Sequence, residues 1–209
     1  ITDTPISPAS YLYNKNLEIK AYDKEKARYL FAEEGYEQDA TTGLMTKDGK
    51  TFSFSLMVNK ENTDRIKVAK EMQKMYANIG VEMKIEEVDK ETYLSRLTSK
   101  QFEAFLGGWQ LSMALDLSFA FRSSSIIGGE NYVSYQDVKM DELLQQAVLA
   151  TGDGIYDAYY ALQDYFSEMS PYISLYFKKS VLMMKKSIGD NIKATPLNIF
   201  SNVEEWTIR

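Results

Sequence analysis

Apolar residues in the middle of the chain switch twice between a helical and a strand-like spacing. From 62 to 79 they recur every three or four positions behind Asn62, which predicts an amphipathic helix that ends at Gly80. The segment 81–88 then alternates between apolar and polar side chains, as in a half-buried strand. The expected strands and helices alternate, at 51–58, 62–79, 81–88, 90–99 and 102–108. This order is typical of a parallel sheet with crossover helices, so we expect an α/β fold.

Helices are also predicted on both sides of this unit. Asp23 is the expected N-cap of a helix that ends at Gly35, and Asp137 is the expected N-cap of a later one. A second late helix covers about 153–169 and stops before Pro171. Two further strands are expected in the tail, at 172–177 and 180–186.

The segment 39–50, DATTGLMTKDGK, combines turn residues with short strand-like runs. Asp39 opens an oxygen-rich turn, but the following positions lack the alternating acidic or amide oxygens of a calcium loop. We therefore expect a plain hairpin and no metal site. Adjacent acids elsewhere point to opposite sides of their element, which favours solvated faces over a glycosidase pair. These acids are Glu86, Glu87, Glu204 and Glu205.

The composition removes several classes of chemistry. The 209 residues include no Cys and no His, which excludes zinc and copper sites, Cys nucleophiles and imidazole bases. The formal net charge of −6 argues against nucleic acid as a partner. No apolar run approaches the roughly 18 residues of a membrane span, and the opening ITDTPISPAS lacks the features of a signal peptide. We expect a soluble chain without a cofactor, as a piece of a longer protein.

The run AFLGGWQLSMALDLSFAF, residues 104–121, places two adjacent glycines before a tryptophan. In parallel sheets, ligands gather at the carboxyl ends of the strands, and Gly107 and Gly108 end the last expected strand. Glycines let a ligand or backbone approach closely, and Trp109 offers a flat apolar wall with one N–H donor. Two interpretations stay open, because Trp109 could line a ligand site or fill the core.

An ordered set of segments covers nearly the whole chain: YDKEKARYLFAEEGY, DGKTFSFSLMVN, VEMKIEEVDKETYL, FEAFLGGWQLSMALDLSFAFRSS, NYVSYQDVKMDELLQQA, YYALQDYFSEMSPYISLYF and TPLNIFSNVEEWTI. Together they resemble the carboxyl-terminal lobe of the extracellular solute-binding proteins, family 5, of oligopeptide and dipeptide ABC transporters, Gram-positive type. The resemblance implies one lobe of a type II periplasmic-binding-protein-like fold, with a mainly parallel sheet flanked by helices.

The resemblance also implies a division of the chain. Residues 1–179 would form the ligand-binding lobe, with an irregular segment at 1–16, and 180–209 would return to pack on the other, absent lobe. The full-length protein would be lipid-anchored at the extracellular face of the cell membrane.

Candidate binding residues are implied by the same resemblance. The loop behind the glycines would line the ligand cleft through Trp109, Gln110, Leu111, Ser112 and Met113. In many peptide-binding members an aspartate of this loop pairs with the free α-amino group of the peptide. Here Ser112 and Ala114 stand where relatives often carry an acid, which leaves Asp116. Because Asp116 lies just before LSFAF, it could equally cap a helix.

The resemblance implies a binding module and not an enzyme. The lobe would belong to a lipoprotein that captures extracellular oligopeptides by hinge closure and delivers them to an ABC permease. Its partners would be the peptide, the missing amino-terminal lobe and the permease. The alternatives are a signalling-peptide receptor, a binder of a nickel chelate or sugar and, from another class, a hydrolase built on Asp116 and a second carboxylate.

Overall fold

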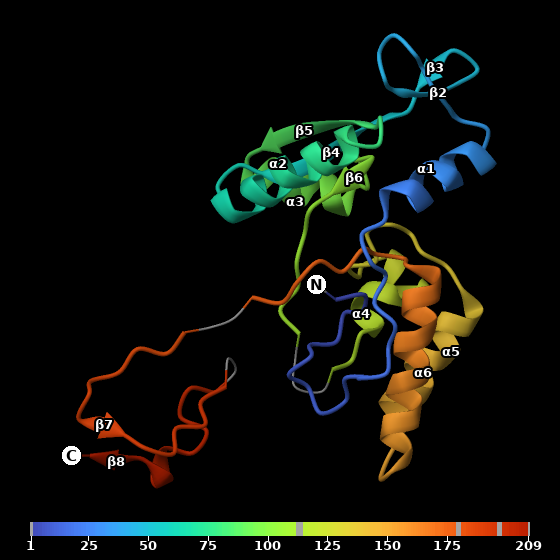
Figure 1. The fold of residues 1–209 in the computed structure, drawn as a ribbon. Coiled ribbons are helices and arrows are strands. Elements are labelled where there is room, and N and C mark those ends of the chain that lie inside the picture. The colour runs from blue at the N-terminus through green and yellow to red at the C-terminus, as the bar shows by residue number, and fades with distance from the viewer. Residues whose placement is uncertain (1, 112–114, 179–180, 196–197, 209) are drawn as a thin grey trace.

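The computed structural model describes residues 2–111, 115–178, 181–195 and 198–208. Figure 1 shows a sheet flanked by helices and, below it, a group of helices beside which the amino-terminal segment runs. We call these the sheet body and the helical body. The carboxyl-terminal tail runs away from both. The expected α/β class is confirmed, because the sheet body contains parallel strands connected by helices.

The sheet body is built on three parallel strands in the order β5-β4-β6. The central strand β4 (Ser53–Asn59) pairs along its whole length with β5 (Glu82–Val88) and pairs on its other side with β6 (Ala104–Phe105). The predicted strand at 102–108 was too long. The Glu103 carboxylate, and not a backbone carbonyl, accepts the N–H of Ser55, at 2.6 Å, so regular pairing begins only at Ala104.

One helix covers each face of this sheet. The core on one face joins Leu56, Val58 and Met83 to Ala69 of α2 (Thr63–Ala77). The core on the other face joins β4 to α3 (Lys90–Thr98), through Met57, Tyr93 and Leu97. This two-sided burial results from the alternation of side chains along β4. The predicted crossover helix and the parallel pairing of its two strands are confirmed.

A helix and a small antiparallel sheet precede the parallel strands. Helix α1 (Lys24–Glu33) is capped by Asp23, whose side chain accepts a hydrogen bond from the N–H of Lys26 at 2.9 Å. The hairpin expected at 39–50 is confirmed, and its three short strands are β1 (Glu37–Gln38), β2 (Met45–Lys47) and β3 (Lys50–Thr51). The Asp39 carboxylate accepts hydrogen bonds from the backbone of Thr41 and Thr42, so it stabilises the turn.

The helical body packs three helices and the amino-terminal residues around one core. The helices are α4 (Ser118–Phe121), α5 (Val138–Leu149) and α6 (Gly154–Met169), and the short η1 (Ser123–Ile126) follows α4. Ile6 and Leu12 of the irregular opening segment are buried in this core. Buried Gln163 fixes that segment, because it accepts from the N–H of Asn14 at 3.1 Å and donates to the carbonyl of Leu12 at 2.8 Å.

The tail differs from the prediction. In the described parts of the two segments expected to be strands, 172–177 and 180–186, the backbone is irregular. The short pair β7 (Ile188–Gly189) and β8 (Thr207–Ile208) forms instead, with the turn η2 (Val203–Glu205) just before β8. Strands need a neighbour for their hydrogen bonds, and the described residues of both segments pair with neither β5 nor β6, the two edge strands of the parallel sheet.

Candidate functional site

The carboxyl edge of the parallel sheet is formed where β4 and β6 end. Behind β6, the carbonyl of Leu106 accepts a hydrogen bond from the buried Tyr93 hydroxyl, at 3.0 Å. A Cβ atom on Gly107 would lie 2.7 Å from Cε2 of Phe105, so the packing of that ring leaves no room for a side chain. The first glycine of the pair is therefore explained by close packing.

Arg65 lies beside the second glycine. It sits in the first turn of α2, and its Nη1 donates to Oδ1 of Asn59, at the end of β4, over 2.9 Å. Its guanidinium carbon lies 5.8 Å from the ring centroid of Tyr93. Its Nη2 is 3.6 Å from where a Cβ of Gly108 would lie. The sequence analysis missed Arg65, although a cation in a helix's first turn, where the dipole favours acids, was an available signal.

Trp109 is half-buried, with its ring against the helical core. It makes edge-to-face contacts with Phe119 at 6.1 Å, Phe121 at 5.8 Å and Tyr172 at 4.9 Å between centroids. Such contacts hold an aromatic ring in a defined orientation. The two interpretations of Trp109 are therefore not exclusive, since part of the ring packs on the core and part is exposed.

The other predicted site residues differ in how far they are buried. Gln110 is exposed, whereas Leu111 is half-buried and packs on the helical core. Ser112 and Met113 lie outside the described residues. The structure thus brings Trp109 and Leu111 to one core surface and leaves the amide of Gln110 in solvent.

Asp116 is exposed and lies immediately before Leu117, the N-cap of α4. Its Oδ1 accepts a hydrogen bond from the N–H of Ser118, the first residue of α4, at 2.8 Å. Burial raises the pKa of nearby Tyr159, and the negative charge of Asp116 raises it further. Asp116 therefore supports the turn that leads into α4 through one of its two carboxylate oxygens, although it is not the N-cap itself.

Tyr172 joins the two bodies and was missed by the sequence analysis. Its ring contacts Phe105 of the sheet body at 6.0 Å and Phe121 of the helical body at 5.3 Å, in addition to Trp109. Burial raises the pKa of Tyr172 to about 12 and outweighs the opposite effect of nearby backbone N–H groups. Tyr172 follows Pro171 in a segment predicted as a strand, so no local pattern marked it as a contact between bodies.

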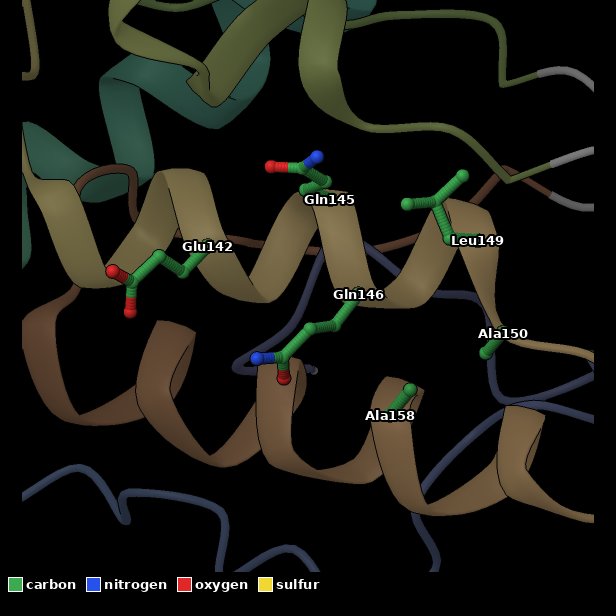
Figure 2. Close-up of a pocket in the computed structure, with 6 residues that line it drawn as sticks. All are labelled: Glu142, Gln145, Gln146, Leu149, Ala150 and Ala158. Carbon is green, nitrogen blue, oxygen red and sulfur yellow. The ribbon is translucent and has the colours of Figure 1, made fainter.

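A hollow of about 520 Å³ lies along α5 and α6. Figure 2 shows Gln146 of α5 and Ala158 of α6 pointing toward one another, while Gln145 and Leu149 point away from α6. The lining residues carry a single charge, that of Glu142, and none of the predicted site residues is among them. We therefore place the candidate site at the sheet edge and Trp109, and not in this hollow.

Metal clusters and membrane-spanning helices are both absent from the described residues. Within 2–111, 115–178, 181–195 and 198–208, no group of three or more acidic side chains is arranged to hold a metal ion. In the same ranges, no helix combines the length and apolar character required to span a membrane.

Comparisons with known proteins find a matching family profile and a similar protein. The profile of the bacterial extracellular solute-binding proteins, family 5 Middle, matches residues 1–126. The oligopeptide-binding protein AppA of Bacillus subtilis is 30% identical over 207 residues, which are 97% of this chain and 38% of that protein.

Solved structures show the same fold. The structure of Bacillus subtilis AppA in complex with a nonapeptide superposes with a TM-score of 0.82 at 29% identity, and covers 100% of this chain and 42% of that one. NikZ from Campylobacter jejuni in complex with Ni(L-His) has a TM-score of 0.74 at 23% identity, with 98% and 43% covered. The chain thus spans about two fifths of the length of these relatives. The family profile covers more than half of the chain, so this protein belongs to the bacterial extracellular solute-binding proteins, family 5.

Proposed function

We propose that this chain is the ligand-binding lobe of a protein that captures extracellular oligopeptides and delivers them to an ABC permease. The observation that carries the proposal is its similarity over the whole chain to AppA, an oligopeptide-binding protein whose structure contains a nonapeptide. The edge with Gly108 and Trp109 supports it, because a glycine lets an extended peptide approach the backbone and a tryptophan offers an apolar wall.

The binding mechanism is closure of two lobes on the peptide. Since this chain spans 38% of the length of AppA, the second lobe is supplied by the rest of the protein. Hinge closure buries the ligand between both surfaces, and backbone hydrogen bonds provide affinity with little selectivity for side chains. The proposal assigns 1–179 to this lobe and 180–209 to a segment that packs on the other lobe.

Exposed apolar side chains in the tail support that division. Val181, Met183 and Ile208 are 82%, 89% and 85% exposed, which is costly for large hydrophobic side chains unless another surface covers them. The two-stranded pair of β7 and β8 is also marginal on its own and favours addition to a larger sheet.

The proposed cleft residues are those behind the glycine pair. Trp109 supplies the wall, and Gln110, Leu111, Ser112 and Met113 continue the cleft loop. The second carboxylate oxygen of Asp116 lies outside its bond to Ser118 and is proposed to accept a hydrogen bond from the peptide's amino group. The function is binding without catalysis, since the chain lacks His and Cys and its relatives are solute-binding proteins.

Two alternatives are kept within the binding class. NikZ was solved with Ni(L-His), so a metal chelate is a candidate ligand for this fold. A receptor for a signalling peptide would share the peptide site and differ only in the fate of the captured peptide. In either case the full-length protein is proposed to act at the extracellular face of the membrane, held by a lipid anchor.

Mass spectrometry of ligands released from the purified full-length protein tests the proposal. The protein is expected to release peptides of several lengths and sequences. A single peptide species would favour the signalling receptor, and a nickel chelate or sugar without peptide would contradict the proposal. Trp109→Ala protein is purified in parallel for comparison and is expected to retain less peptide.

A further inference from the structure

Arg65 is a cation whose position is fixed by neutral groups. Its Nη1 bonds to the Asn59 amide oxygen, and the guanidinium lies over the Tyr93 ring. Asn59 ends β4 and Tyr93 is buried in α3, so both supports belong to regular elements of the sheet body. The guanidinium is therefore oriented before any ligand arrives.

Among the described residues, no carboxylate pairs with Arg65. Two other arginines do have such partners, because Arg28 pairs with Glu25 and Arg96 with Glu86. The neighbouring acid Asp64 is engaged elsewhere, with Nζ of Lys178 at 3.1 Å. In a chain with 30 acidic residues, a half-buried guanidinium whose supports are an amide oxygen and an aromatic ring lacks a carboxylate to compensate its charge.

The Nη2 end of Arg65 lies beside Gly108. Its Nη2 is 3.6 Å from the position that a Cβ of Gly108 would take, and Gly108 precedes Trp109. Among the described residues, the Arg65 guanidinium donates its hydrogen bond through Nη1, to Asn59, and Nη2 donates none. A guanidinium has five N–H donors in a planar fork that matches the two oxygens of a carboxylate.

We propose that Arg65 binds a carboxylate of the peptide ligand at the carboxyl edge of the sheet, and this inference rests on the peptide-binding function proposed above. The carboxylate is either the carboxyl terminus of the peptide or an Asp or Glu side chain within it. Asn59 and Tyr93 are positioning residues that hold the guanidinium, and Gly108 leaves room for the peptide beside it.

The test uses ligand-free full-length protein and three synthetic nonapeptide libraries. One has a free carboxyl terminus and no acidic residue, the second is its carboxyl-terminal amide, and the third is an amide with one Asp. Dissociation constants are measured for the wild type, Arg65→Gln, Arg65→Lys and Arg96→Gln. Arg96→Gln is the matched control, because Arg96 lies on α3 and is already paired with Glu86.

Arg65→Gln is expected to weaken binding about 10- to 100-fold for the library that supplies the carboxylate, and to leave the library without it unchanged. A loss for the free acid alone identifies the carboxyl terminus, and a loss for the Asp library alone identifies a side chain. Arg65→Lys should recover part of the affinity, because an ammonium keeps the charge without the fork. Arg96→Gln should bind all libraries as the wild type does.

Two outcomes overturn the inference. If the wild type binds peptides and Arg65→Gln binds every library equally well, Arg65 takes no part in recognition. If Arg65→Gln weakens all three libraries by the same factor, its role is structural. A wild-type protein that binds none of the libraries would overturn the proposed function itself, and the assignment of Arg65 with it.

Discussion

The rings of Trp109 and Tyr172 lie nearly perpendicular, with centroids 4.9 Å apart and an interplanar angle of 79°. The same tyrosine contacts Phe105 of the sheet body and Phe121 of the helical core. Trp109 is therefore one member of an aromatic group that joins the two bodies. A ligand that packs on its exposed part would contact this junction directly.

Trp109→Ala in the full-length protein is expected to lower both stability and peptide affinity. Truncation of a fully buried tryptophan to alanine costs about 3–5 kcal/mol of folding stability, so truncation of the half-buried Trp109 should cost about 2 kcal/mol. Affinity should fall about tenfold through loss of the apolar wall. Chemical unfolding and calorimetry measure the two effects. Lowered stability with unchanged affinity would show that Trp109 serves the core alone.

Gly107→Ala and Gly108→Ala form a matched pair. The added methyl of Gly107→Ala would lie 2.7 Å from the Phe105 ring, and this clash should cost about 1–3 kcal/mol of stability. The methyl of Gly108→Ala meets its nearest atom at 3.6 Å, so the fold should be unaffected while the peptide loses its close approach. Equal stability of the two variants would contradict the packing explanation for the first glycine.

Tyr172 is expected to link stability to alkaline pH. Its pKa is raised to about 12 from the usual 10.0, so the folded state holds the proton more tightly than the unfolded chain does. This stabilisation is complete below pH 10 and is lost as the pH rises toward 12. Tyr172→Phe should therefore lose stability less steeply than the wild type over that range. Tyr176→Phe, at a 48% exposed site, should behave like the wild type.

Asp137 is expected to link stability to acid pH. Its carboxylate accepts from the N–H of Met140 at 2.7 Å and from the Tyr165 hydroxyl at 2.9 Å, and the Met140 bond is the main cause of its lowered pKa. The stabilisation is present above pH 3.8, the usual carboxyl value, and is lost as the pH falls through the lower folded value.

Two variants separate the effect of the Asp137 charge from the effect of its N-cap hydrogen bond. Asp137→Ala should cost about 1 kcal/mol at neutral pH through loss of the N-cap. Asp137→Asn keeps a capping oxygen and does not titrate, so its stability should depend less steeply on acid pH than that of the wild type. Identical acid unfolding curves for Asp137→Asn and the wild type would contradict the assignment.

Much of the fold could be predicted from the sequence because its signals are local. Alternation of side chains defines β4 and β5, and the three predicted caps, Asp23, Asn62 and Asp137, each accept the expected backbone hydrogen bond. Gly80 lies in the turn just after α2 with a φ of 77°, a conformation that favours glycine. Each of these features depends on residues only a few positions apart.

The candidate site could be predicted only in part. The glycine pair and Trp109 were found because a strand end followed by glycine and tryptophan is a local pattern. Arg65 and Tyr172 were missed, since their contacts join elements that lie far apart in the sequence. The tail strands were wrong because an apolar segment becomes a strand only when its backbone pairs with a neighbour, and the described residues of these segments pair with neither edge strand of the parallel sheet.

Calorimetric titration of peptide into the full-length protein and into residues 1–209 alone tests the central claim most directly, because a clamp needs both lobes to bury its ligand. Full-length protein is expected to bind nonapeptides at micromolar or lower concentration, and the lobe alone at least about 100-fold more weakly. Binding by the lobe alone within about tenfold of the full-length affinity, or no peptide binding by the full-length protein, would contradict the account.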